Sequence, residues 1–324
     1  MGTLYLDRSG LELRIDGDAV ALYTRGERSG TVPIGLLEKI VIKGEISLTS
    51  NVLGRLADAG VSVLMLSARH SRRVAFVHGR FHNDARIRLA HYRAVLDDEY
   101  ALGWSRRIVR AKISAQVAFL KRAGDEKPEA KKDLFGPIAG LKSCGEALSN
   151  AVTTDGVRGL EGASARLYFA GLSHLFPPSL QFNGRNKRPP RDPVNAVLSL
   201  AYTLAHHEAV RACHLAGLDP LLGFLHKPAW GRESLACDLI EPFRPRLDAW
   251  VWGLFRERIL RPEDFHRDKG AVLLGKAGRH RFYEAYEAKG PVWSRALIRL
   301  ARALASSVTK KTPDLFLADE EDDS

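Results

Sequence analysis

One segment of the chain brings together a histidine and two carboxylates that could hold a metal ion. In GLDPLLGFLHKPAWGRESLACDLIEPFRP, residues 217–245, an apolar run leads to His226 and a loop containing Pro and Gly, and Asp238 and Glu241 follow in a segment of helical pattern. Residues three apart share one helical face, so the two acids lie on a strip with apolar neighbours and at least one should point toward the interior. A buried carboxylate without a partner is unfavourable, and this one therefore needs a cation.

Two kinds of cation could satisfy that carboxylate. Arg244 or Arg246, just downstream, would make a purely structural ion pair. The functional alternative is a metal ion shared with Glu161, because carboxylate oxygen with imidazole nitrogen suits Mn²⁺ or Mg²⁺ better than a sulfur-rich zinc site would. Glu161 stands in LEGASARLYFAGL, directly before small residues that open a predicted helix. There it either projects into a cleft or simply stabilises the first helical turn.

A second group of possible ligands lies in HHEAVRACH, residues 206–214, which lacks the HExxH pattern of zinc enzymes. His207 and His214 share a face across two helical turns, but they are too far apart along the axis for one ion. We therefore expect this segment to pack in the core or to form a solvated helix face.

A basic loop, FNGRNKRPPRD, places four cations in a connection rich in Pro and Gly: Arg185, Lys187, Arg188 and Arg191. Because a loop cannot bury such charge, we expect these side chains to be solvated. The loop is then either only a solvated connection or, near a metal-bound carboxylate cluster, a segment that holds the phosphate backbone of DNA. Other basic residues also lie close together in the sequence, and their simpler role is to keep a helix soluble. They are Arg106, Arg107, Arg110, Lys112, Lys310 and Lys311.

The net charge also indicates a polyanionic partner. The 324 residues include 49 Lys and Arg against 38 Asp and Glu, a net charge of +11, and five of the acids lie in the last six residues. Without that acidic end the body carries about +16, and so basic a surface concentrates phosphates around it. An anionic membrane surface or an acidic protein would be served by the same charge. The composition, 45% hydrophobic and 27% charged, excludes a mostly disordered or fibrous chain.

The cysteines and the apolar stretches indicate the compartment. Cys144, Cys213 and Cys237 are odd in number and widely spaced, so they provide neither a disulfide framework nor a CxxC zinc site. The first residues lack the apolar core of a signal peptide, and no stretch reaches the roughly 18 uncharged apolar residues of a membrane span. We predict a protein of the reducing cytoplasm that does not enter a membrane.

The spacing of apolar residues changes once along the chain. Residues 3–80 hold short β-rich runs, interrupted by a short helix at 51–60 that ends at Gly60. After residue 86 apolar residues recur every three or four positions, as in helices, and the first helical stretch stops at Gly124.

Gly and Pro, as in GPIAG, then break residues 137–305 into about five or six helices. The fold class expected is α+β, with a small amino-terminal β-domain at 1–85, a larger all-α catalytic domain at 86–312 and an acidic, disordered tail at 313–324.

Four motifs, in order, resemble a known family. EGASARLYF, DPVNAVLSLAYTLAHHEA, GLDPLLGFLH and SLACDLIEPFRP are similar to those of CRISPR-associated protein one, the integrase and metal-dependent DNA endonuclease of the CRISPR adaptation module. TVPIGLLEKIVIKGEISLTSNVLGRLADAGVSVLML resembles the family's β-domain, and RFYEAYE resembles its late helical segment. The chain departs from the family at Cys237, where an aliphatic residue is usual, and at SARHSRR, which replaces a turn richer in Gly.

The resemblance implies a specific site and reaction. Glu161, His226 and Glu241 fall on the family's metal-site positions, and Asp238 falls on an acidic position that either binds the metal or orients a neighbour. In this antiviral defence system, the 3′-hydroxyl of a short foreign fragment attacks a phosphodiester of the CRISPR array, and water in its place gives nuclease activity. The implied partners are double-stranded DNA, a second copy bound through the β-domain, and the companion CRISPR-associated protein two.

Two alternatives stay open at this stage. In the first, the protein is a non-catalytic basic scaffold that binds DNA, and the acids and the histidine serve packing and ion pairs. In the second, it is a related transposon integrase with the same centre but no companion protein. Loss of turnover in a chelator would separate the enzyme from the scaffold, and neighbouring genes would separate the two integrases.

Overall fold

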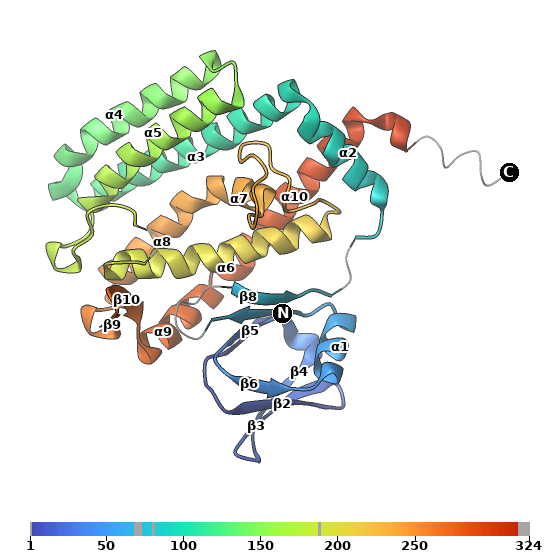
Figure 1. Ribbon diagram of the computed structural model, residues 1–324. Coiled ribbons are helices and arrows are strands. Elements are labelled where there is room, and N and C mark those ends of the chain that lie inside the picture. Colours follow the sequence, from blue (N-terminus) through green and yellow to red (C-terminus); the bar gives the residue numbers. More distant parts are fainter. Residues whose placement is uncertain (1, 68–72, 80–81, 187–188, 317–324) are drawn as a thin grey trace. The chain divides into compact units, whose positions relative to one another are not determined.

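The computed structural model describes residues 2–67, 73–79, 82–186 and 189–316 (Figure 1). The chain forms two compact units. The first, the β-rich unit, combines Met1–His82 with Arg279–Trp293, and the second, the helical unit, combines Asn83–Gly278 with Ser294–Ser324. An amino-terminal sheet region followed by a mostly helical region confirms the predicted α+β class.

Two four-stranded sheets build the β-rich unit. One has the order β4-β3-β2-β6, in which only the β2/β6 pair is parallel, and the other has the order β1-β5-β7-β8, in which only the β7/β8 pair is antiparallel. The strands are β1 (Gly2–Leu6), β2 (Leu11–Asp16), β3 (Ala19–Thr24), β4 (Glu27–Pro33), β5 (Leu37–Lys43), β6 (Ile46–Leu48), β7 (Ser62–Leu66) and β8 (Arg73–Val77). Successive side chains of a strand point to opposite faces of its sheet. In β2, Leu11 and Leu13 are buried, while the side chains between and after them are more exposed.

Helix α1 (Ser50–Asp58) confirms the short helix expected at 51–60. Val52 and Leu56, one turn apart, enter the core of the β-rich unit beside Leu13 and Ile40. Gly60 has φ +73°, the left-handed conformation that glycine adopts without a Cβ penalty, so the predicted stop signal is correct.

The segment Arg279–Trp293 belongs with the β-rich unit. The ring of Tyr283 stacks on that of Tyr5 with centroids 4.5 Å apart, and Thr3 N–H donates to Glu287 Oε1 at 2.8 Å. The predicted boundary at 85/86 lies close to the first division between the units, at 82/83, but the sequence places this late segment, including RFYEAYE, in the helical domain. Long-range pairing of this kind leaves no local signal in the sequence.

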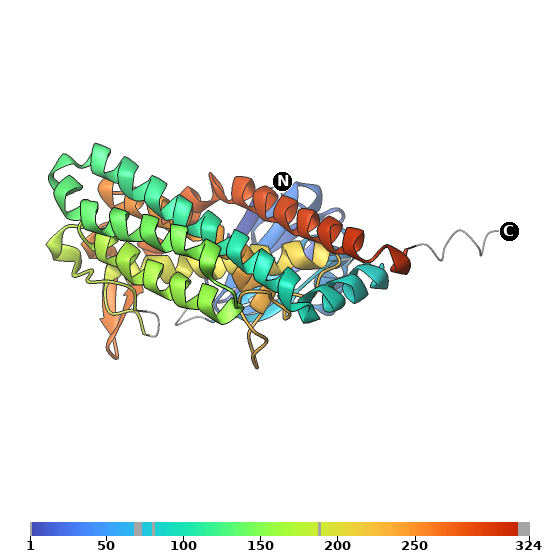
Figure 2. The same cartoon turned by 90° about the horizontal axis from the view of Figure 1, so that it is seen from above.

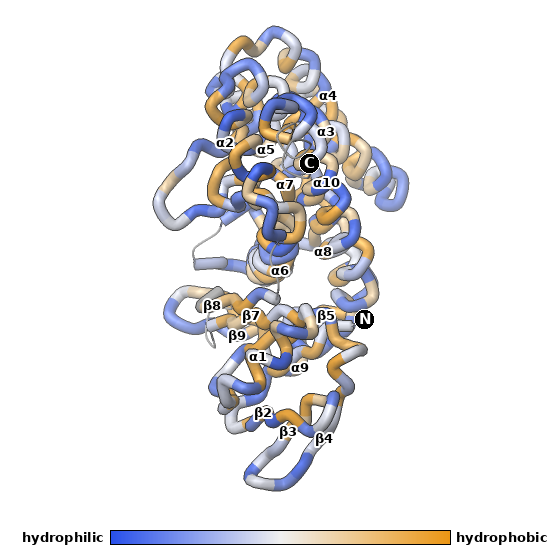
Figure 3. Tube along the Cα trace, turned by 90° about the vertical axis from the view of Figure 1, so that its right-hand side faces the viewer, coloured by the Kyte–Doolittle hydropathy of each residue, from blue (hydrophilic) through white to orange (hydrophobic). Residues whose placement is uncertain are grey.

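Helices dominate the other unit. They are α2 (Ala85–Leu96), α3 (Asp98–Glu126), α4 (Lys131–Ala147), α5 (Thr154–Ser173), α6 (Pro193–Leu215), α7 (Ser234–Ile240), α8 (Arg244–Arg256), α9 (Lys276–Glu287) and α10 (Gly290–Lys311), with α9 and α10 crossing into the β-rich unit. Short 3-10 turns include η5 (Glu241–Phe243), and a hairpin joins β9 (Phe265–Asp268) to β10 (Ala271–Leu274). Helices α3, α4 and α5 lie side by side (Figure 2). Orange and blue alternate along the helices in Figure 3, as expected when each buries one face.

The helix boundaries of this unit differ from the sequence predictions in three places. The first helical stretch is two helices, because Asp97 interrupts it and its carboxylate accepts from Tyr100 N–H at 2.9 Å as the N-cap of α3. Gly124 does not end α3: it is buried, and a Cβ there would lie 3.3 Å from Leu134 Cδ1, so it permits close approach of α4. Pro137 lies inside α4, where it packs closely against Gly171 of α5.

The carboxyl-terminal segment is described as far as residue 316. Pro313–Leu315 forms a 3-10 turn, and Asp314 pairs with Arg93 at 2.5 Å, so the tail predicted at 313–324 begins with an ordered turn. The acidic residues from 319 onward lie outside the described residues. Among the helices of the described part, none combines the length and the apolar character needed to cross a membrane.

Candidate active site

The GFLH segment is held in place by one buried carboxylate. Asp238, on α7, is fully buried, and its two oxygens accept the backbone N–H groups of the residues at 224, 225 and 226 at 2.7, 2.9 and 3.1 Å. Gly223 is required there, since a Cβ would lie 2.7 Å from Asp238 Oδ2 and 2.8 Å from the Ser234 backbone. Burial raises the pKa of the Asp238 carboxyl, and these hydrogen bonds together with that from His226 oppose the rise.

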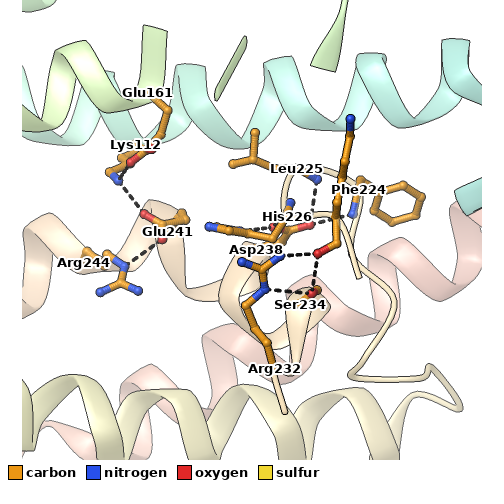
Figure 4. Close-up of polar contacts among 11 residues, drawn as sticks. Lys112, Glu161, Phe224, Leu225, His226, Arg232, Ser234, Asp238, Glu241 and Arg244 are labelled. Carbon is orange, nitrogen blue, oxygen red and sulfur yellow. Dashed lines mark hydrogen bonds and ion pairs between the residues drawn. The ribbon is translucent and has the colours of Figure 1, made fainter. Parts of the chain in front are cut away.

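The same carboxylate orients the histidine. His226 Nδ1 lies 2.6 Å from Asp238 Oδ1, and the imidazole remains partly exposed (Figure 4). With Nδ1–H donating to the carboxylate, the lone pair is on Nε2. A histidine in this arrangement is prepared to bind a metal ion through Nε2, because a carboxylate on the other nitrogen fixes both the tautomer and the ring.

Glu241 is buried at the start of η5 and has two cationic partners. Lys112 Nζ donates to Oε2 at 2.5 Å, and Arg244 Nε donates to Oε1 at 2.9 Å. Although burial alone would favour the protonated form, Arg244 and Lys112 outweigh it and lower the pKa of Glu241 to about 2. The group is therefore a carboxylate at neutral pH, and the structural ion pair with Arg244 that the sequence allowed is present.

Glu161 meets Glu241 through Lys112. Its Oε1 accepts a hydrogen bond from the same Lys112 Nζ, so two carboxylates from different elements converge on one ammonium group (Figure 4). The expectation that Glu161 opens a helix is wrong: α5 begins at Thr154, where Thr153 Oγ1 accepts from Gly156 N–H at 3.1 Å, and Glu161 lies further along. The exposed fraction of its side chain is 24%, so one edge of the site is open to solvent.

The chemistry of this donor set fits Mn²⁺ or Mg²⁺. Two carboxylates and an imidazole nitrogen are ligands that these ions accept, and the carboxylates already converge on a positive charge. The side chains are not closed into a cage: within the described residues, no group of three His, Cys, Asp or Glu is gathered tightly enough to hold an ion. Lys112 supplies the charge between Glu161 and Glu241 that a metal ion would supply.

Lys112 is the site residue that the sequence analysis missed, because it was grouped with the basic residues of a soluble helix face. It is buried on α3, and the two carboxylates outweigh the effect of burial and raise the pKa of its ammonium group. A signal for this existed. Lys112 falls on the helical stripe that also carries Ile108, Gln116 and Phe119, all buried.

A buried polar network formed by Tyr202, Tyr168 and Asp248 holds Arg244 in place. Its guanidinium lies 4.5 Å from the ring centroid of Tyr202, a cation–π contact. The hydroxyls of Tyr202 and Tyr168 both donate to Asp248, the latter at 2.9 Å. Burial raises the pKa of Asp248 to about 6 against the opposing effect of these hydrogen bonds. Residues of α5, α6 and α8 thus hold Arg244, and through it Glu241.

The basic loop is less solvated than expected. Arg185 is half-buried: it donates to Asn195 Oδ1 at 2.7 Å and to Ser199 Oγ at 3.1 Å, and it also lies over the ring of Tyr202. The expectation that all four cations are solvated is therefore wrong for this residue. Arg191 is exposed, as predicted, and Lys187 and Arg188 lie outside the described residues.

The residues of the second histidine segment lie on α6 and mostly face the core. His207 and Glu208 are buried, and His206 Nε2 lies 3.0 Å from Glu233 Oε2. These positions agree with the packing role expected for the segment.

Comparison with known proteins settles the family. The family model described as CRISPR associated protein Cas1 matches residues 4–288. The chain belongs to the Cas1 family. A relative in Thermodesulfovibrio yellowstonii, named CRISPR-associated endonuclease Cas1 1, is 40% identical over 294 residues, which cover 89% of this chain and 91% of the relative. The resemblance inferred from the four motifs is confirmed.

Solved structures show that the Cas1 fold extends over nearly the whole chain. A casposase bound to integration product has a TM-score of 0.85 at 24% identity, with 96% of this chain and 91% of that chain covered. A Cas6-RT-Cas1–Cas2 complex has a TM-score of 0.81 at 20% identity, with 95% of this chain and 35% of that longer chain covered. At these identities the likeness establishes the shared fold.

Proposed function

We propose that this Cas1-family protein is a metal-dependent DNA integrase and endonuclease that inserts short foreign DNA fragments into a CRISPR array. The observation that carries the proposal is the convergence of the Glu161 and Glu241 carboxylates on one cationic position beside His226. The relative named as an endonuclease and the fold shared with a casposase bound to integration product support phosphodiester chemistry.

Each site residue has a defined task in this proposal. Glu161, His226 and Glu241 would hold Mn²⁺ or Mg²⁺, which, when bound, polarises the scissile phosphate and offsets the charge on its oxygens. Asp238 fixes the ring and the tautomer of His226. Arg244 keeps Glu241 ionised and in position. The 3′-hydroxyl oxygen of the fragment forms the new P–O bond as a P–O bond of the array breaks, and water as the nucleophile gives a nick instead.

The proposed partners follow from the fold and the charge. Net charge +11 favours binding of double-stranded DNA. A related structure is named as a Cas6-RT-Cas1–Cas2 complex, which supports assembly with the companion Cas2. We further propose a homodimer formed through the β-rich unit and a cytoplasmic location, where the array and invading DNA are accessible.

Strand transfer tests the proposal directly. The purified chain, with and without Cas2, is incubated with a DNA fragment bearing a 3′-hydroxyl and a supercoiled plasmid bearing the repeat, in Mn²⁺ or in chelator. We expect fragment-plasmid joining in Mn²⁺ and none in chelator or with a 3′-dideoxy fragment. Binding of DNA without any joining or nicking in Mn²⁺, with Cas2 present, would favour the non-catalytic scaffold. Full activity without Cas2 at unrelated target sites would favour the transposon-type integrase.

A further inference from the structure

One face of α10 carries exposed cations and no acid. Steps of four, three and eight residues keep the cations within a single stripe of the helix, and α10 contains no Asp or Glu. On the opposite side of the helix, Leu297, Leu304 and Val308 are buried. The exposed side chains, called here the cationic face, are those of Arg295, Arg299, Arg302 and Lys310.

The cationic face lacks acidic partners among the described residues, whereas cations close by have them. Lys311, the next residue of the helix, pairs with Asp97 at 2.5 Å, and Arg86 of α2 pairs with Asp84 at 2.9 Å. Like charges three or four residues apart on a helix repel one another. The helix dipole favours cations in the last turn only, so it offsets this repulsion for Lys310 but not for the arginines. An anionic ligand would offset it along the whole face.

The chain that follows α10 carries the complementary charge. Asp314 pairs with Arg93 of α2 at 2.5 Å, and the guanidinium carbon of Arg86 lies 5.2 Å from the ring centroid of Phe316, the last described residue. In Figures 1 and 2 this end of α10 lies beside α2. The five acids at 319–323, called here the acidic segment, therefore start three residues after a point that is fixed on the helical unit.

The acidic segment is long enough to reach the cationic face. An extended chain covers at most about 3.6 Å per residue, so position 319 lies within about 11 Å of Phe316 and position 323 within about 25 Å. The face extends about 22 Å along α10, at a rise of about 1.5 Å per residue. Because Lys310 precedes Phe316 by only six residues, a segment that turns back along α10 meets Lys310 first and Arg302 next.

We propose that the cationic face of α10 is a docking surface for the acidic segment of the same chain, and that the docked segment competes there with the phosphates of DNA. Since the segment is tethered, it meets the face at an effective concentration in the millimolar range, and ion pairs that are weak singly are then sufficient. DNA displaces it only when the DNA engages more cations than the segment does. Docking is independent of the proposed function, and the competition rests on it.

The anisotropy of a fluorophore joined after Ser324 of the full chain measures docking without DNA or metal. Two variants of unchanged length are compared with the wild type. The tail-neutral variant carries Asp319→Asn, Glu320→Gln, Glu321→Gln, Asp322→Asn and Asp323→Asn. The face-neutral variant carries Arg295→Gln, Arg299→Gln, Arg302→Gln and Lys310→Gln, all at exposed positions where glutamine preserves the helix.

At low salt the wild type should show a higher anisotropy than either variant, and added salt should lower it to their value by screening the ion pairs. A matched control removes four exposed cations from α3, α4 and α5 and should keep the wild-type anisotropy. Its substitutions are Lys121→Gln, Lys132→Gln, Lys142→Gln and Arg166→Gln. An excess of unlabelled face-neutral chain should change nothing, because each labelled chain supplies its own face.

Binding of a blunt duplex in chelator tests the competition. The tail-neutral variant should bind about 3-fold to 30-fold more tightly than the wild type at low salt, because several weak ion pairs no longer cover the face. In the face-neutral background the same five substitutions should gain less than about 2-fold, which measures the effect of net charge alone. In the background of the matched control the gain should equal that in the wild type.

The results that would overturn this inference differ from those that bear on the proposed function. Equal anisotropy in the wild type and the face-neutral variant would reject docking, and the integrase proposal would stand if that wild type still joins strands in Mn²⁺. Equal gains of affinity in the wild-type and face-neutral backgrounds would reject the competition. A fall in anisotropy on adding unlabelled face-neutral chain would assign the face to the segment of a second copy. If the segment docks but no variant binds DNA, the competition and the proposed function both fail.

Discussion

His226 Nδ1 lies 2.6 Å from an oxygen of Asp238, and the same carboxylate accepts three backbone N–H groups of the segment that carries the histidine. One buried side chain therefore fixes both the loop and the imidazole ring. The sequence left two roles open for Asp238, metal ligand or orienting partner. Because Oδ1 of Asp238 accepts from the ring and backbone of His226 and Oδ2 accepts from the backbone N–H groups at 224 and 225, the geometry favours the orienting role.

Replacement of Asp238 by Asn should therefore weaken metal binding without removing a ligand. The amide keeps the shape but presents an N–H₂ either to the two N–H donors on Oδ1, which include the His226 ring, or to the two backbone N–H donors on Oδ2, so the ring or the loop that carries it loses its anchor. We expect Mn²⁺ affinity, measured by calorimetry, to fall about 10-fold to 100-fold, as for other changes to a group that orients a metal-binding histidine. DNA affinity in chelator should stay the same. If the variant binds Mn²⁺ and joins strands like the wild type, Asp238 is structural and leaves the site.

Glu161→Ala, His226→Ala and Glu241→Ala should each abolish nicking and strand joining. Glu161 and His226 are partly exposed, so their variants should unfold near the wild-type temperature. Removing the buried Glu241 also leaves Lys112 and Arg244 without their shared carboxylate and costs about 3–5 kcal/mol. Glu241→Gln, which keeps the volume, provides the matched variant. Wild-type rates in any two of the three alanine variants, with unchanged circular dichroism, would refute the assignment.

Lys112→Met should separate metal binding from stability. Without the ammonium group, the carboxylates of Glu161 and Glu241 lose the cation between them, so in chelator the variant should melt at a lower temperature than the wild type. Mn²⁺ then no longer competes with the Lys112 ammonium group, although Arg244 still pairs with Glu241, and its affinity should rise about tenfold or more.

The readouts for Lys112→Met are calorimetric Mn²⁺ titration and the increase in melting temperature on adding Mn²⁺. Lys121→Met, at an exposed position of the same helix, controls for loss of a positive charge. Weaker Mn²⁺ binding in Lys112→Met would show instead that the lysine positions the two ligands.

Local patterns in the sequence predicted the elements better than they predicted where those elements meet. The alternating and helical spacing of apolar residues correctly predicted the change from strands to helices and the short helix that ends before Gly60. Both features depend on residues that are neighbours in the chain. Gly124 and Pro137 were misleading because tertiary contacts with Leu134 and Gly171 override their usual effect.

The site itself depends on long-range packing. Glu161 on α5 and Glu241 on η5 meet only through Lys112 on α3, and no local pattern pairs residues so distant. Residue types suggested a metal ion shared by Glu161, His226 and the acid pair, and the resemblance to a family then assigned the metal-site position in that pair to Glu241.

The salt dependence of DNA affinity tests the basic loop. Neutralising Arg185, Lys187, Arg188 and Arg191 together should weaken binding of every sequence alike, because phosphate contacts carry no base information. For each phosphate that the variant no longer binds, the negative slope of log affinity against log salt should become less steep by roughly 0.9 for duplex DNA. Since Arg185 is tied to Asn195 and Ser199, a variant that changes only the other three should show most of the effect.

Glu241→Ala is the control in that titration, because it alters the site but removes no basic side chain and should leave the slope nearly unchanged. An unchanged slope in the quadruple variant would show that the loop is only a connection and that DNA contacts other cations.

Asp248 should make stability depend on pH between about 4 and 6. Its pKa is raised to about 6 in the folded protein, where Tyr168, Tyr202, Arg185 and Arg244 face it, against an ordinary value of 3.8. Between these values the folded state keeps a proton that the unfolded state releases, so the free energy of unfolding attributable to this group falls as pH rises from about 4 to 6. At about 1.4 kcal/mol for each pKa unit, the fall is about 3 kcal/mol.

Asp248→Asn carries no such proton, while its amide oxygen can accept from one tyrosine hydroxyl and its N–H₂ can donate to the oxygen of the other. Urea unfolding at pH 4, 5, 6 and 7 should therefore show the free energy of unfolding of the wild type dropping by about 2–3 kcal/mol relative to Asp248→Asn over this range. Other carboxylates, including Asp238, contribute equally to both proteins and cancel in the difference. Asp125→Asn, at an exposed carboxylate whose partner is Lys131, is the matched control and should follow the wild type. Parallel curves for the wild type and Asp248→Asn would mean that Asp248 is already ionised at pH 4, stabilised by Arg244 and Arg185 more strongly than burial opposes it.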